Sequence, residues 1–77
     1  MIMIRINDSE DLGFLRKMNK YTLKQVAEKF GVHPTYISHI EKGKRTLTAD
    51  MQHRFAQLYK VDLETVYKLY RNAKDKQ

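Results

Sequence analysis

The side chains best suited to recognise another molecule lie between Gly31 and Ile40, a stretch without formal charge. If this stretch is helical, Ile37 and Ile40 face a core and the polar side chains face outward. The outward side chains carry hydroxyl, imidazole or ammonium groups: Thr35, Tyr36, Ser38, His39 and Lys42. Hydroxyl and imidazole groups can bond base edges, and the threonine methyl can contact thymine. The pattern favours base recognition over an ordinary solvated face, which more often carries glutamate and lysine.

Basic residues flank this stretch on both sides. Four lie between Arg16 and Lys24 without an intervening acid, and Lys42, Lys44 and Arg45 form a second cluster. The whole chain carries 15 Lys and Arg against 9 Asp and Glu, a formal net charge of +6. Because such cations neutralise phosphates, the charge favours a polyanion as partner, and its clustering favours this over the alternative of a generic basic protein.

Signals of catalysis and metal binding are weak. The chain has no cysteine, which excludes disulfides, thiolate nucleophiles and cysteine-based zinc sites. His33, His39 and His53 lack the i, i+4 spacing of a helical zinc site. The sequence also contains no glycine-rich phosphate loop and no nucleophile elbow. We therefore expect no enzyme activity, no metal and no cofactor.

Length and composition indicate one folded domain. The chain has 77 residues, of which 42% are hydrophobic and 31% charged, with 3 Gly and 1 Pro. This composition is typical of a helix-rich globular protein and not of a disordered tail. The apolar stretch from Met1 to Ile6 is too short for a signal peptide or a membrane span. We expect a cytoplasmic, nucleoid-associated protein with no membrane partner.

The apolar spacing predicts three helices in the first half of the chain. The first begins with Ser9 as N-cap and ends near Asn19. The second begins after Thr22, its expected N-cap, and ends at Gly31, where a left-handed residue is expected. The third begins with Pro34, which tolerates the first helical position. Their expected inward residues are Leu12, Leu15, Met18, Val26, Ala27, Phe30, Ile37 and Ile40.

Two further helices and a short arm complete the predicted domain, 1–77. Thr48 caps the fourth helix, and Asp62 caps the fifth, which fades into a charged tail. The alternation of methionine and isoleucine before Asn7 predicts an extended arm over 1–8. The five predicted helices then form a helical body over 9–72, and a basic tail follows over 73–77. Expected inward residues are Met51, Phe55, Leu58 or Tyr59 in the fourth helix and Leu63, Val66, Tyr67 and Tyr70 in the fifth.

Two short helices joined by a turn with a glycine form the sequence signature of a helix-turn-helix. Ala27 supplies the small residue needed where the two helices cross, four residues before Gly31. The third helix, from about His33 to Lys42, is then the one that enters the major groove.

Residues 22–45, TLKQVAEKFGVHPTYISHIEKGKR, resemble the Cro/repressor (Xre-like) helix-turn-helix family. The resemblance extends from about Leu12 to Val66, and the run IEKGKR at 40–45 is its most specific part. It implies an all-α, five-helix, Cro/lambda-repressor-like domain with a short N-terminal extended arm. It also implies base contacts by Thr35, Ser38 and His39, with Tyr36 at the groove edge.

The same resemblance implies contacts to phosphates near the base-reading helix. Leu23 stands where many relatives carry a phosphate-binding glutamine, so that contact is lost or passes to a neighbour. Leu47 replaces a common proline, and Lys60 replaces a common glycine, which indicates a different cap or slight strain. The expected phosphate contacts are Thr22, Lys24, Gln25, Lys42, Lys44 and Arg45.

Glu41 is an unexpected charge beside DNA, and the resemblance implies a structural ion pair between Glu41 and Arg16. The alternative, in which Glu41 accepts a hydrogen bond from a cytosine amine, is less favoured.

The last helix and the arm carry more apolar surface than one packed face requires, which suggests an interface. Tyr67, Leu69 and Tyr70 spread around more than one face of the last helix, and Ile2 and Ile4 lie in the arm. Exposed patches of this kind often mark a subunit contact, so we expect a homodimer through one or both. The alternative is that the arm folds back on its own core.

The sequence as a whole predicts a sequence-specific transcriptional regulator, in particular a repressor of phage or mobile-element type that occupies a DNA operator. A second interpretation is an antitoxin or adaptor that binds a protein partner with its last helix. A third is nonspecific nucleoid binding, which predicts affinity indifferent to sequence.

Overall fold

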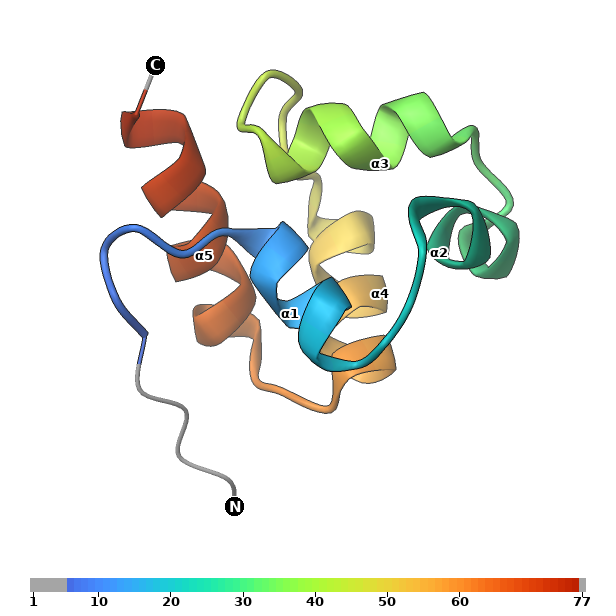
Figure 1. The fold of residues 1–77 in the computed structure, drawn as a ribbon, viewed down its shortest axis with the longest axis horizontal. Helices are drawn as coiled ribbons and strands as arrows, with labels where there is room; N and C mark the ends of the chain where they lie inside the picture. The colour runs from blue at the N-terminus through green and yellow to red at the C-terminus, as the bar shows by residue number, and fades with distance from the viewer. Residues whose placement is uncertain (1–5, 77) are drawn as a thin grey trace.

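Five α-helices joined by short turns form the part of the chain that the computed structural model describes, residues 6–76 (Figure 1). No strand occurs within these residues, so the predicted all-α, five-helix fold is confirmed. The helices are α1 (Leu12–Met18), α2 (Leu23–Phe30), α3 (Pro34–Glu41), α4 (Ala49–Tyr59) and α5 (Leu63–Asp75).

Helix starts follow local capping chemistry. Thr22, Thr48 and Asp62 each accept a hydrogen bond from a backbone N–H in the first turn of the following helix, as predicted. The prediction of Ser9 as the first cap is wrong. Asp11 takes that role because its carboxylate accepts from the Phe14 N–H at 3.2 Å, so α1 begins later than expected.

The C-cap residues of α2 and α4 are in the left-handed conformation. Gly31 closes α2 with φ of 68°, as its position predicts. Lys60 closes α4 with φ of 56°, although a side chain makes this conformation costly. The backbone N–H of Val61 still bonds to the Ala56 carbonyl at 3.1 Å, so this carbonyl in the last turn of α4 has a hydrogen-bond partner. Lys60 therefore carries the local strain that its replacement of a glycine indicated.

One hydrophobic core receives residues from all five helices. Phe55 lies fully buried within it, its ring edge-on to Phe30 and stacked on Tyr59 at centroid distances of 5.2 and 5.9 Å. The prediction that Met18 is inward is wrong, since this residue in the last turn of α1 is 57% exposed. The largest fully buried side chains are Leu12, Leu15, Val26, Ile37, Ile40, Phe55, Val66 and Leu69.

The buried face of α5 differs from the predicted one. Val66, Leu69, Tyr70 and Ala73 are buried, whereas Leu63 and Tyr67 are more than one third exposed. The helix also continues to Asp75 instead of fading at Arg71, because Ala73 extends the apolar face by a further turn. Leu69 and Tyr70 are therefore core residues of this chain. Tyr67 is the exposed member of the predicted apolar surface on α5.

The described end of the N-terminal arm lies against α5 (Figure 1). The Asn72 amide donates to the Asn7 carbonyl at 3.1 Å, the Lys76 ammonium donates to the Ser9 carbonyl, and Ile6 packs against the core. Ile2 and Ile4, the predicted interface residues of the arm, lie outside the described residues. Between residues 6 and 76, the helices are all too short or too polar to cross a bilayer.

Candidate nucleic-acid interface

The turn between α2 and α3 sets the direction of α3. The Val32 N–H bonds to the Ala27 carbonyl at 3.0 Å, and the small, buried Ala27 side chain leaves room for the crossing helix. His33 then caps α3, because its Nδ1 accepts from the Thr35 N–H at 3.1 Å, and Pro34 occupies the first helical position. The His33 imidazole is thus the N-cap of α3.

The outer face of α3 carries the predicted recognition residues. Ile37 and Ile40 are fully buried and fix the opposite face of the helix in the core. Thr35 is exposed, while Ser38 and His39 are partly exposed beside it. Their hydroxyl and imidazole groups can donate to or accept from base edges without moving the helix.

The loop after α3 brings its cations to the C-terminal end of that helix. The His39 carbonyl accepts from the N–H groups of Lys44 and Arg45 at 2.8 and 3.3 Å. This folds the loop back under the helix end and leaves both cationic side chains exposed. The Arg45 guanidinium lies 5.9 Å from the centre of the Tyr36 ring, close enough for a cation–π contact. Lys42, the C-cap of α3, is also exposed.

The predicted phosphate contacts on α2 lie at the start of that helix. Thr22 and Gln25 form a reciprocal capping box, in which the Gln25 amide oxygen accepts from the Thr22 N–H at 2.8 Å. The amide oxygen of Gln25 is thus engaged, while the amide nitrogen can still donate. Lys24 is exposed on the same turn. Thr22, Lys24 and Gln25 therefore form one group, and Lys42, Lys44 and Arg45 form a second at the far end of α3.

A buried ion pair joins the end of α3 to α1. Arg16 donates to both carboxylate oxygens of Glu41, at 2.8 Å from Nε and 3.3 Å from Nη2. A third Arg16 donor reaches the Tyr21 carbonyl at 3.1 Å. A side chain on Gly13 would put its Cβ 3.2 Å from the Glu41 carboxylate, so glycine allows this close approach.

Burial dominates the electrostatics of this pair. Desolvation raises the pKa of Glu41 above its ordinary value and outweighs the lowering effect of the hydrogen bonds and charge of Arg16. Burial also raises the pKa of Tyr59, to which the nearby charge of Glu41 adds. Glu41 is thus held in the protein interior and lies away from the exposed face that would meet bases.

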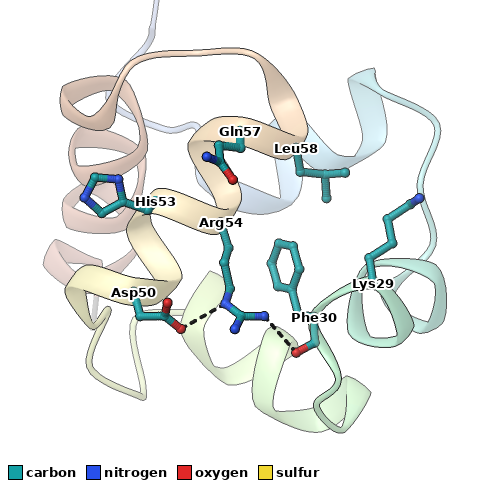
Figure 2. A pocket seen from close by; sticks show the side chains of 7 residues that line it. All are labelled: Lys29, Phe30, Asp50, His53, Arg54, Gln57 and Leu58. Carbon is teal, nitrogen blue, oxygen red and sulfur yellow. Dashed lines mark hydrogen bonds and ion pairs between the residues drawn. The ribbon is translucent and has the colours of Figure 1, made fainter.

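Arg54 forms a second link to the helix-turn-helix segment, one that no sequence pattern indicated. Figure 2 shows its guanidinium between Asp50 and the end of α2. It bonds to the Asp50 carboxylate at 2.9 Å and to the Phe30 carbonyl at 3.1 Å. Because Phe30 is the last residue of α2, this contact ties α4 to the turn that leads into α3. The only local signal is the i, i+4 spacing of Asp50 and Arg54.

The described residues contain no group of three or more His, Asp or Glu side chains placed to hold a metal ion. His53 is exposed on α4 and lines a shallow hollow with Arg54 and Gln57 (Figure 2). His33 and His39 belong to α3 and its cap.

Comparison with protein families supports this geometry. A family model described as a helix-turn-helix domain matches residues 10–72, most of the chain. None of the curated proteins and none of the solved structures matches the chain.

Proposed function

The chain belongs to the helix-turn-helix domain family, and from this premise we propose that it is a sequence-specific regulator of transcription, of the Cro/repressor (Xre-like) type. In this proposal α3 enters the major groove of double-stranded DNA, and the protein represses a promoter of phage or mobile-element type by occupying its operator in the cytoplasm. The helix-turn-helix domain alone already suggests DNA binding. The proposal adds that the binding is specific for an operator and that it represses transcription.

The outer face of α3 carries the proposal. Thr35, Ser38 and His39 offer hydroxyl and imidazole groups for hydrogen bonding, and Lys44 and Arg45 are held at the helix end by bonds from their backbone N–H groups to the His39 carbonyl. Groups that can discriminate bases thus lie next to groups that can bind phosphates, the division of labour that specific recognition needs. A pure protein-binding adaptor has no use for this combination.

Selection from fragmented host and phage DNA at about 150 mM salt tests the proposal, followed by titration of the recovered fragment beside a random duplex. We expect a preference of about 10³-fold or more for the recovered fragment. Alanine at Thr35, Ser38 and His39 should remove that preference, since alanine favours the helix and leaves its buried face intact. A His53→Ala, Gln57→Ala variant of α4 serves as the matched control and should retain it.

Two results would contradict the proposal. Equal affinity for all duplexes would indicate nonspecific nucleoid binding, and no affinity for DNA would indicate an antitoxin or adaptor.

Sedimentation equilibrium on the same samples tests whether the protein forms a homodimer. A dimer predicts a near-palindromic operator with half-sites about 34 Å apart, whereas a monomer predicts a single half-site.

A further inference from the structure

The last turn of α5 lies directly against the loop that follows α3. A Cβ added to Gly43 would come within 2.6 Å of the Lys74 Cα and 2.7 Å of its backbone nitrogen. Only a residue without a side chain permits this approach, and its φ of 73° also favours glycine. In Figure 1 the C-terminal end of α5 stands beside this loop. Lys74 is thereby placed next to the immediate neighbours of Gly43.

This contact gathers cations from two distant parts of the chain. Lys42 and Lys44 flank Gly43 in the sequence, Arg45 follows, and Lys74 joins them from α5; all four are exposed. Asp75 is the acid next to Lys74 in the sequence, so cations predominate at this corner. Like charges brought together repel unless an anion lies between them. The cluster is therefore suited to a polyanion that contacts the loop and α5 together.

The position of Lys74 relative to α3 indicates which part of DNA it meets. With 8 residues, α3 is about 12 Å long, close to the width of the major groove. If α3 crosses the groove, groups just beyond its C-terminal end are level with the phosphates at the groove edge. The other two cations at this end of α5 make contacts within the chain: Lys76 donates to the Ser9 carbonyl, and Arg71 lies over the Tyr67 ring.

We propose that Lys74 binds a DNA phosphate, so that the DNA-binding surface extends beyond the helix-turn-helix onto the last turn of α5. The inference rests on the proposed function, because it assumes that α3 faces DNA. It adds a contact from a helix to which sequence analysis assigned only subunit or protein partners. The competing explanation is that Lys74 merely offsets the negative end of the α5 dipole.

Salt dependence separates the two explanations. We compare Lys74→Gln with the wild type on the selected fragment and on a random duplex, between 50 and 300 mM salt, using fluorescence anisotropy. Loss of one phosphate contact should reduce the slope of log K against log salt by about 0.9 and weaken both duplexes roughly fivefold to tenfold at 0.1 M salt. Lys74→Arg should restore both. Lys68→Gln is the control, because it makes the same charge change on an exposed position of α5.

An equal slope for Lys74→Gln and Lys68→Gln would overturn the inference and leave the proposed function intact. If the wild type binds no duplex, it is the proposed function that fails.

Neutral methylphosphonates placed singly along the selected fragment provide a second test. One position should weaken the wild type but add no further loss to Lys74→Gln, as expected when the two changes remove the same contact. Full additivity at every position would also overturn the inference.

Discussion

The two ends of α3 are held by the same chemistry in opposite environments. At the C-terminal end, Arg16 and Glu41 pair with side chains that are only 12% and 8% exposed. Before the N-terminal end, Arg54 pairs with Asp50 and bonds to the Phe30 carbonyl, but these side chains are 43% and 72% exposed. The buried Arg16–Glu41 link should therefore resist disruption, whereas water can replace the contacts of the exposed Arg54 link.

This difference has a structural consequence. A buried charge without its partner is strongly unfavourable, so any separation of α1 from the end of α3 is penalised. An exposed arginine that loses its partner is solvated, so the α2–α3 turn depends mainly on the packing of Phe30 against Phe55. Breaking the link at the C-terminal end of α3 should therefore cost more than breaking the exposed link before its N-terminal end.

Removing one partner of the buried pair should produce the largest effect. Arg16→Met leaves the Glu41 carboxylate buried and unpaired, and should lower the free energy of unfolding by about 3–5 kcal/mol at neutral pH. In a domain of this size such a loss is a large part of the total stability. Urea denaturation monitored by circular dichroism measures it.

The double variant Arg16→Met, Glu41→Leu sharpens this prediction. It removes both charges, so its stability should lie well above that of Arg16→Met and approach the wild type. Equal destabilisation by the single and double variants would show that packing, and not the stranded charge, accounts for the loss.

Disrupting the exposed link should have a smaller effect. Arg54→Met loses the bond to the Phe30 carbonyl and the ion pair with Asp50, for about 1 kcal/mol in total. Asp50→Asn is the matched control, because it weakens the ion pair and leaves the bond to Phe30 in place, and should cost about 0.5 kcal/mol. Urea midpoints of the two variants measure the difference. A loss for Arg54→Met as large as that for Arg16→Met would contradict the comparison.

Sequence patterns predicted the features that depend on neighbouring residues. Thr22, Thr48 and Asp62 were recognised as caps, and Gly31 as a left-handed end, because each signal lies within one turn of the helix end. The extent of α3 followed from the same kind of signal. The first cap was misplaced because Ser9 and Asp11 are both good caps and lie only two positions apart.

The features that were missed depend on contacts between distant residues. Tyr67 and Leu69 are both apolar, so the sequence did not reveal which one the neighbouring helices cover. The bond from Arg54 to Phe30 spans 24 residues and ends on a carbonyl, which has no sequence signature. The Arg16–Glu41 pair spans 25 residues and was expected only from a family resemblance. The base and phosphate contacts remain predictions.

The pH dependence of stability provides the subtlest test of the comparison. Burial raises the pKa of Glu41 above its ordinary value of 4.5, so above that pH the native state binds more protons than the unfolded chain. The free energy of unfolding should therefore fall as the pH rises through this window. Asp62 behaves oppositely: hydrogen bonds from Thr65 lower its pKa below the ordinary 3.8, so stability should rise with pH through that lower window.

Denaturation in urea at a series of pH values, for the wild type and Glu41→Gln, measures both contributions. The wild type should gain stability through the window of Asp62 and lose part of it above pH 4.5, whereas Glu41→Gln should gain without the later loss. If wild-type stability instead continues to rise above pH 4.5 and Glu41→Gln does not follow it, the attraction of Arg16 outweighs burial. The attraction between Arg16 and Glu41 would then itself stabilise the end of α3, in addition to the penalty for leaving one charge buried alone. The difference in stability between this link and the exposed link of Arg54 would be larger than burial alone predicts.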